Sequence, residues 1–229
     1  RLDLGEVAPF AIVSEQQSSG RGRRGRLWVS PYGENLYFTL VFKIDQGVRQ
    51  LEGLSLVVGL AVLQALRKFG LIRAGLKWPN DVLVLGRKIA GVLIELAGDL
   101  AEVCHVVIGV GVNVNMLQTA EQIEQKWTSI AIESGKLIDR NGLLTEIQLQ
   151  LDQYLFTHLN KGFTALCQEW EANNLWQDRQ VVLTAGANNV SGTVRGVDST
   201  GALKLLVDGE LRSFSGGEIS LRLQDDSRG

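Results

Sequence analysis

The sequence has few residues that bind soft metal ions or form disulfides: two cysteines and two histidines in 229 residues. Cys104 and Cys167 lie far apart, and one pair of cysteines makes no disulfide framework, so both are predicted to be core thiols. Cys104 and His105 are adjacent, and no second pair follows at the spacing of zinc ligands. The sequence therefore supports neither a disulfide-stapled fold nor a metal site built from soft ligands.

Long apolar runs are also missing. No stretch approaches the ~20 apolar residues of a bilayer-spanning helix, and the first residues, 1–4, lack the layout of a signal peptide. The chain is thus expected to be cytoplasmic, with no membrane partner. Its formal net charge of −2 argues against a surface that attracts nucleic acid as a whole.

Periodicity predicts a first domain of strands and helices and a small second domain of strands. Runs typical of strands occupy residues 10–13, 35–43, 76–79, 82–85, 89–96 and 103–112. Apolar residues at helical spacing predict helices over residues 51–69, 141–159 and 163–170. From residue 180 onward, short strands separated by Gly or Asn turns predict a small β-barrel. We expect residues 1–176 to form the first domain and residues 177–229 the second.

An arginine- and glycine-rich loop follows the first predicted strand. It reads Gly20-Arg21-Gly22-Arg23-Arg24-Gly25. The glycines allow close backbone approach and the guanidinium groups suit a phosphate or carboxylate ligand. The segment is not a P-loop, and it satisfies the dinucleotide-binding pattern only formally. From the loop alone, an anion site and a solvated or nucleic-acid-binding loop are both open.

A second cluster combines a lysine, an aromatic ring, an amide and a carboxylate. It is the run Lys77-Trp78-Pro79-Asn80-Asp81. Asp81 could hold magnesium beside triphosphate oxygens, although spacing alone favours simple turn chemistry for an Asn-Asp pair.

Two further features accompany that cluster. Lys88 begins the apolar strand that follows, where it could neutralise a reacting carboxylate or serve only as an edge lysine. Gly109, Gly111 and Asn113 interrupt a packed strand, which indicates that a ligand or another backbone approaches closely.

Taken together, these motifs resemble the catalytic domain of biotin protein ligases. The resemblance spans residues 13–115, and residues 201–222 are similar to the family's small SH3-like C-terminal domain. It is carried by Glu15-Gln16-Gln17, Gly20 to Pro31, Asn35-Leu36-Tyr37, Lys77 to Asp81, Arg87 to Gly91 and Gly109 to Asn113.

The resemblance implies an α+β fold, with a mixed sheet flanked by helices as in class II aminoacyl-tRNA synthetases, followed by an SH3-like β-barrel. It implies an enzyme that uses ATP and Mg²⁺ to convert biotin to biotinyl-5′-adenylate. The biotinyl group would then pass to a lysine of a biotin carboxyl carrier protein, such as that of acetyl-CoA carboxylase. A short form without a DNA-binding domain is expected, and a homodimer is favoured weakly.

The resemblance also implies roles for individual residues. Lys88 and Arg23 are expected to be catalytic. Biotin or the adenylate is expected to contact Gln17, Arg21, Gly22, Arg23, Trp28 and Lys88, with Trp28 near the adenine. ATP is expected to contact Lys77, Asn80, Asp81, Gly111 and Asn113, with magnesium on Asp81. The family's Ser-Thr-Asn-type biotin-binding segment is not found among the residues before Ser14.

Two other functions fit part of the sequence. A lipoate or octanoate ligase or transferase shares the superfamily, but the arginine loop together with the 77–81 run favours biotin. A nucleic-acid-binding module would use the arginines as phosphate contacts, yet the net charge is negative and no series of stacking aromatics accompanies them.

Overall fold

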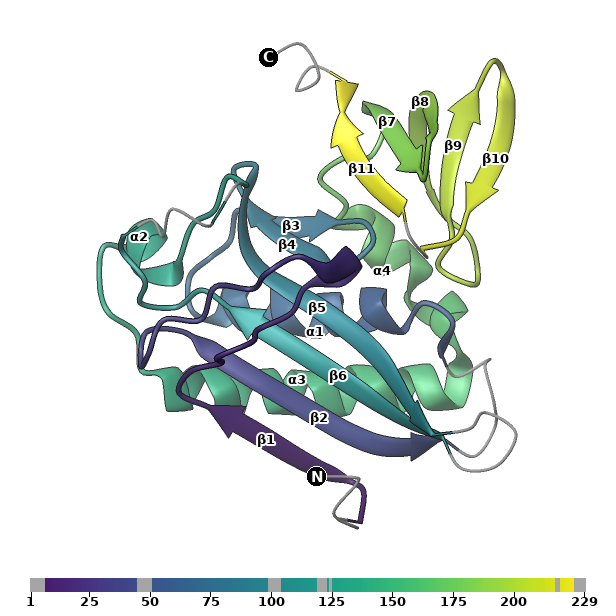
Figure 1. Cartoon of the computed structure of the whole chain (residues 1–229). Helices are drawn as coiled ribbons and strands as arrows, with labels where there is room; N and C mark the ends of the chain where they lie inside the picture. The colour runs from purple at the N-terminus through teal and green to yellow at the C-terminus, as the bar shows by residue number, and fades with distance from the viewer. Residues whose placement is uncertain are drawn as a thin grey trace.

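The computed structural model of the chain describes residues 7–44, 51–98, 104–118, 123, 125–216 and 219–224. A six-stranded sheet backed by helices forms the larger part, and a five-stranded sheet forms the smaller part (Figure 1). None of the helices in these ranges has the length and apolar character needed to cross a membrane.

The larger sheet has the strand order β1-β2-β6-β5-β4-β3. Its strands are β1 (Phe10–Ser14), β2 (Leu36–Ile44), β3 (Ala74–Lys77), β4 (Asp81–Val84), β5 (Arg87–Gly98) and β6 (Cys104–Val112). Every ladder between them is antiparallel. Strands β3, β4 and β5 follow one another through short turns, which antiparallel strands permit and parallel strands do not. A mixed sheet was expected, but the only parallel pairings among the described residues are two isolated bridges, Leu76–Asn174 and Lys88–Trp127.

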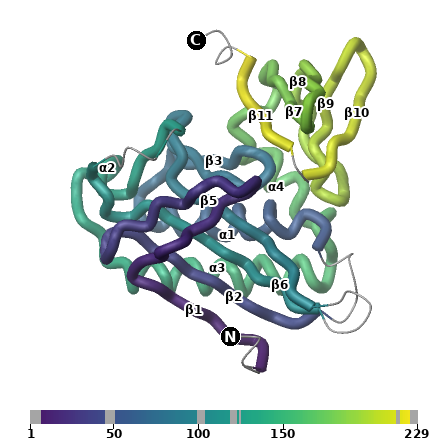
Figure 2. The backbone as a smooth tube through the Cα atoms, in the orientation of Figure 1, coloured from purple at the N-terminus to yellow at the C-terminus, as the bar shows by residue number. Residues whose placement is uncertain are grey.

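Helices cover one face of this sheet. They are α1 (Leu54–Lys68), α2 (Ile130–Ser134), α3 (Arg140–Lys161) and α4 (Cys167–Ala172), with the 3-10 turn η4 (Phe163–Leu166) before α4. A second 3-10 turn, η2 (Arg23–Gly25), belongs to the arginine loop. In β6 every second residue, from Cys104 to Val112, is buried and belongs to the core that also contains α1 and α3. The alternate residues, including Gly109 and Gly111, are partly exposed on the opposite face. The arginine loop crosses that opposite face in front of β5 (Figure 2).

The smaller sheet contains β7 (Gln180–Ala185), β8 (Asn188–Val197), β9 (Leu203–Val207), β10 (Glu210–Phe214) and β11 (Ile219–Leu223). It is antiparallel, in the order β10-β9-β8-β7-β11. The expectation of a closed barrel is wrong for the described residues, because β10 and β11 lie at opposite ends of the sheet and form no ladder with each other. The first four residues of β10 are exposed, and Glu210 and Arg212 form an ion pair of 3.2 Å there. Water can reach the backbone groups of this exposed edge, and its charged side chains discourage pairing with another strand.

Candidate active site

One carboxylate lies between two lysines at the end of the β3–β4 hairpin. The hairpin register places Lys77 directly opposite Asp81. Lys88 pairs with Leu83, where the register between β4 and β5 shifts, and its side chain reaches Asp81. The Nζ atom of Lys88 lies 2.7 Å from Oδ1 of Asp81, and Nζ of Lys77 lies 3.8 Å from Oδ2. The three side chains are only 13–22% exposed. Removal of one of them would therefore leave a largely buried charge without its partner.

A tryptophan ring covers each of these lysines. The Lys88 ammonium lies 5.2 Å from the ring centroid of Trp28, and the Lys77 ammonium lies 4.6 Å from that of Trp176. Ammonium groups within about 6 Å of an aromatic face are attracted by the ring quadrupole. Both cations are thereby held without an added carboxylate, which leaves the cluster with an excess of positive charge.

The floor of the site is formed by glycines of β5 and β6. A Cβ atom built on Gly111 would lie 2.5 Å from Cε2 and Cζ2 of Trp28, and one on Gly91 would lie 3.2 Å from Cζ3. The indole thus rests directly on the sheet, as the glycine pattern predicts for a close approach. Its Nε1 atom is buried and has no hydrogen-bond partner among the described residues. The floor therefore accommodates a flat ring with a polar edge.

The arginine loop closes the site through Arg23. One guanidinium nitrogen of Arg23 donates to Oδ1 of Asn80 at 3.3 Å, and the other donates to the carbonyls of Gly216 and Ile219 in the smaller sheet. Burial lowers the pKa of Arg23 from its usual value, and Asp81 opposes that effect. Arginine stays charged at neutral pH, so the structure brings a third cation to Lys77 and Lys88.

Burial and neighbouring cations destabilise the charged form of Lys77. Burial is the largest cause that lowers the pKa of Lys77, with Lys88, Arg26 and Arg222 acting in the same direction. Asp81 opposes them. An anionic ligand that entered here would relieve this repulsion, since it adds negative charge where cations outnumber carboxylates.

Positive charge continues into an open groove between the arginine loop and the smaller sheet. The groove has a volume of about 410 Å³. Its described lining residues include three arginines and no carboxylate: Arg24, Arg26, Thr184, Asn189, Ser220 and Arg222. Guanidinium and hydroxyl donors of this kind suit phosphate oxygens.

Two sequence families match the chain. The Biotin/lipoate A/B protein ligase family matches residues 6–113, and the Biotin protein ligase C terminal domain matches residues 178–222. The biotin--[acetyl-CoA-carboxylase] ligase of Paracoccus denitrificans is 34% identical over 85% of this chain and 82% of its own length. The chain belongs to the biotin protein ligase family.

Solved structures and longer proteins of the biotin protein ligase family give the same result. The biotin protein ligase from Aquifex aeolicus in complex with biotin and ATP matches with a TM-score of 0.85 and 31% identity, over 96% of this chain and 91% of that one. The bifunctional ligase/repressor BirA of Salmonella typhimurium is 40% identical over 93% of this chain. The chain spans 66% of the length of that relative. The expected family and the α+β fold with an SH3-like second domain are confirmed.

Most residues that the family resemblance selected lie together, and a few lie at the margin. Arg23, Trp28, Lys77, Asn80, Asp81, Lys88 and Gly111 surround the glycine floor. Arg21 instead forms an exposed ion pair of 3.1 Å with Glu95, and the backbone nitrogen of Gly22 donates to Arg26 within the loop. Gln17 accepts a hydrogen bond of 3.2 Å from Ser30.

The side-chain amide of Asn113 is already engaged in hydrogen bonds with the backbone. Its amide nitrogen donates to the carbonyl of Thr128 at 3.0 Å and to that of Lys88 at 3.5 Å, and its side chain is buried. Its backbone nitrogen donates to Ile89 at 2.8 Å. Asn113 therefore fixes the start of β5, from which Lys88 projects. Its predicted contact with ATP stays a prediction.

Four charged or aromatic residues of the site were not selected from the sequence. They are Arg24, Arg26, Trp176 and Arg222. Arg24 belongs to the arginine loop and Arg26 follows it directly, so their charges were visible. Nothing in the local pattern of Trp176 or Arg222 indicated that either would lie near Lys77, because both approach it from distant parts of the chain.

The residues near Asp81 do not form a metal cage. In the described ranges no group of three His, Cys, Asp or Glu side chains is placed to hold a metal ion. Asp81 is instead the counter-ion of two lysines. Mg²⁺ commonly binds one or two carboxylates together with substrate phosphates, so a magnesium role for Asp81 depends on the nucleotide and stays a prediction.

Proposed function

We propose that this chain activates biotin with ATP and transfers the biotinyl group to a lysine of a biotin carboxyl carrier protein. The observation that carries the proposal is the lysine pair around Asp81 beside the Trp28 indole on its glycine floor, because it concentrates positive charge and an aromatic face at one place. The chain also belongs to a family in which a solved relative is in complex with biotin and ATP, which supports the same conclusion.

The first step joins two anions. An oxygen of the biotin carboxylate attacks the α-phosphorus of ATP, a new O–P bond forms, and the bond to pyrophosphate breaks. The ammonium of Lys88 and the guanidinium of Arg23 lower the repulsion between carboxylate and phosphate and stabilise the charge that develops. The groove with Arg24, Arg26 and Arg222 extends this positive field toward the leaving pyrophosphate.

The second step forms the amide. The neutral amine of the acceptor lysine attacks the carbonyl carbon of biotinyl-5′-adenylate, and the C–O bond to the phosphate breaks. AMP leaves with the negative charge, and the attacking nitrogen loses one proton to solvent as the amide forms. Lys88 and Arg23 again lie where that charge appears. Water would consume the mixed anhydride between the steps, so the arginine loop has to stay closed over it.

Further expectations belong to the same proposal. Magnesium enters as part of the substrate MgATP, and the Gln17, Arg21 and Gly22 contacts form when biotin and adenylate are bound. Residues 1–176 carry the chemistry and residues 177–229 supply the carbonyls that hold Arg23. A cytoplasmic location, homodimer formation and the absence of DNA binding stay predictions.

Arg23→Gly is expected to release biotinyl-5′-adenylate prematurely. The variant loses the donors to Asn80, Gly216 and Ile219 and one cation over the phosphate. Charge-assisted hydrogen bonds contribute about 1.5–3 kcal/mol each, so dissociation of the adenylate is expected to be faster by about tenfold or more. Gel filtration followed by mass spectrometry of the retained adenylate measures this.

The matched control is Arg73→Gly, which removes an arginine from an exposed turn. It is expected to retain adenylate as the parent does. Equal retention by Arg23→Gly and the parent would contradict the closing role of the loop.

Biotin-dependent exchange of pyrophosphate into ATP tests the first step, with lipoate as the comparison. Exchange with biotin and none with lipoate is expected. Preference for lipoate would assign the chain to the other branch of the Biotin/lipoate A/B family, and no exchange with either would refute adenylate formation by this chain.

A further inference from the structure

Trp176 lies in the segment between α4 and β7, and its ring covers the ammonium of Lys77 at 4.6 Å. The nearer oxygen of Asp81 is 3.8 Å away, whereas Lys88 approaches the same carboxylate to 2.7 Å. Lys77 thus interacts with Asp81 more weakly than Lys88 does, and the aromatic face of Trp176 gives its ammonium a second stabilising contact. Cation–π attraction is larger at partly buried positions such as this one.

Backbone pairing fixes Trp176 relative to Lys77. Leu76, the neighbour of Lys77 in β3, donates its N–H to Asn173 at 2.8 Å, and its carbonyl accepts from Leu175 at 2.9 Å. The Leu175 side chain also lies against the bare Cα of Gly75, where a Cβ would be 2.6 Å from it. Residues 173–175 therefore extend the edge of the larger sheet in parallel, one residue before Trp176.

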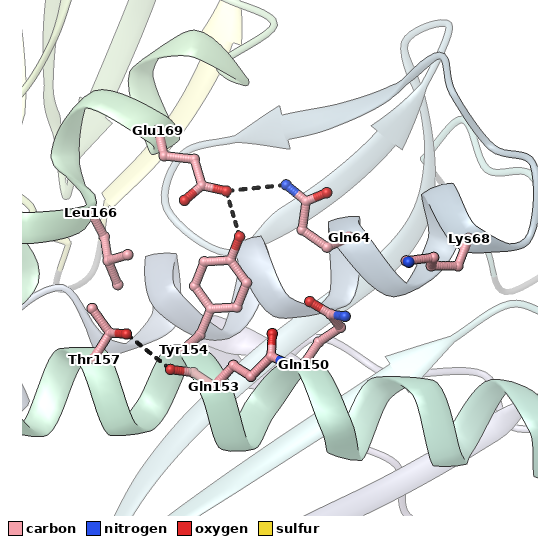
Figure 3. A pocket seen from close by; sticks show the side chains of 8 residues that line it. All are labelled: Gln64, Lys68, Gln150, Gln153, Tyr154, Thr157, Leu166 and Glu169. Atoms are coloured by element: carbon pink, nitrogen blue, oxygen red, sulfur yellow. Dashed lines mark hydrogen bonds between the residues drawn. The ribbon is translucent and has the colours of Figure 1, made fainter.

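A polar network between helices anchors the same segment from behind. Asn173 accepts a hydrogen bond of 2.6 Å from Arg67 of α1 and donates one of 2.7 Å to the carbonyl of Glu169 in α4. Glu169 accepts from Tyr154 of α3 and, at 3.1 Å, from Gln64 of α1, as Figure 3 shows. Burial and the nearby carboxylate raise the pKa of Tyr154, so its hydroxyl stays a donor.

The segment continues directly into the smaller sheet. The carbonyl of Trp176 accepts from Arg179 at 3.0 Å, and Arg179 in turn accepts from Val194 of β8 at 3.0 Å. Trp176 is consequently tied to α1, α3, α4, the edge strand β3 and the smaller sheet, while its ring reaches into the site. A surface loop that served only as a connector would not need this many ties.

We propose that Trp176 is a positioning residue for Lys77, holding its ammonium for the phosphates of ATP while the β3 edge and the smaller sheet hold Trp176. The inference rests on the proposed function. It gives the segment between the two sheets a part in nucleotide binding and none in the contact with biotin.

Two substitutions separate this role from packing. Trp176→Leu keeps an apolar side chain but removes the ring, and Trp176→Phe keeps an aromatic face. In biotin-dependent pyrophosphate exchange, Trp176→Leu is expected to raise KM for ATP by about five- to tenfold, which corresponds to the loss of one cation–π contact. KM for biotin is expected to be unchanged, and Trp176→Phe is expected to restore KM for ATP to within about twofold of the parent.

The contact itself is measured by NMR of the intact protein labelled with ¹³C in its lysines, with the Lys77 signal assigned by its loss in Lys77→Arg. A ring-current shift of the Lys77 methylene next to the ammonium is expected in the parent and in Trp176→Phe, and its loss in Trp176→Leu.

An unshifted Lys77 signal in the parent overturns the contact. A lost shift with unchanged KM for ATP, or equal increases in KM for ATP and biotin, overturns the positioning role. Absence of exchange by the parent refutes the proposed function and with it the role in ATP binding, whereas the NMR result still decides the contact.

Discussion

Replacing Lys88 by alanine is expected to slow biotin-dependent pyrophosphate exchange by about 100-fold or more, as removal of one preorganised donor at a developing charge commonly does. The change removes the cation that contacts Asp81 at 2.7 Å and leaves that carboxylate with Lys77 at 3.8 Å. Asp81 would then repel the biotin carboxylate. Initial exchange rates at saturating biotin and ATP measure the effect.

Two further variants show whether Lys88 acts in the reaction or only in stability. Lys136→Ala changes an exposed lysine and is expected to leave exchange unaltered. The double variant Lys88→Ala, Asp81→Asn removes the uncompensated carboxylate, so it is expected to recover thermal stability without recovering exchange. Recovery of exchange in the double variant would mean that Lys88 serves only to neutralise Asp81.

Gly111→Ala is expected to weaken ATP binding by about tenfold or more and to lower the free energy of unfolding by about 1–3 kcal/mol. The added methyl group would lie 2.5 Å from two ring carbons of Trp28, which has to shift. The displaced indole would no longer hold the adenine that is expected to lie near it. Calorimetric titration with ATP and denaturation in urea measure the two effects separately.

Gly109→Ala is the matched control, two residues earlier on the same strand and the same face. A Cβ on Gly109 would meet Leu93 at 3.6 Å or more, which is ordinary contact. Its ATP affinity is expected to equal that of the parent. A similar loss of affinity in both variants would show that the strand tolerates no side chain on this face, and the assignment of the floor to Gly111 would be lost.

The sequence was sufficient to select the residues that share one short segment. Lys77 and Asp81 are a register pair across a single turn, and Lys88 follows on the next strand, so local pattern brings them together. Trp176 was not predictable, since its approach to Lys77 depends on the pairing of residues 173–175 with β3 and on the Glu169–Tyr154 network. Contacts of this kind become visible only when helices and sheet are packed.

Element types were predicted better than boundaries and closure. The helix expected over residues 51–69 begins at Leu54, because Gly53 has a left-handed φ of 69° and stands before the first turn. The helix expected over residues 163–170 divides into η4 and α4. Barrel closure depends on where β10 and β11 lie relative to each other, which alternation along a single strand does not encode.

Transfer of labelled biotin to a purified biotin carboxyl carrier domain, in the presence of MgATP, tests the central claim most directly. The account predicts that mass spectrometry finds one biotinyl group on one lysine of the carrier, that AMP and pyrophosphate accumulate in equal amounts, and that Lys88→Ala transfers almost none. An unmodified carrier after incubation with a chain that is folded and binds biotin and ATP would contradict it.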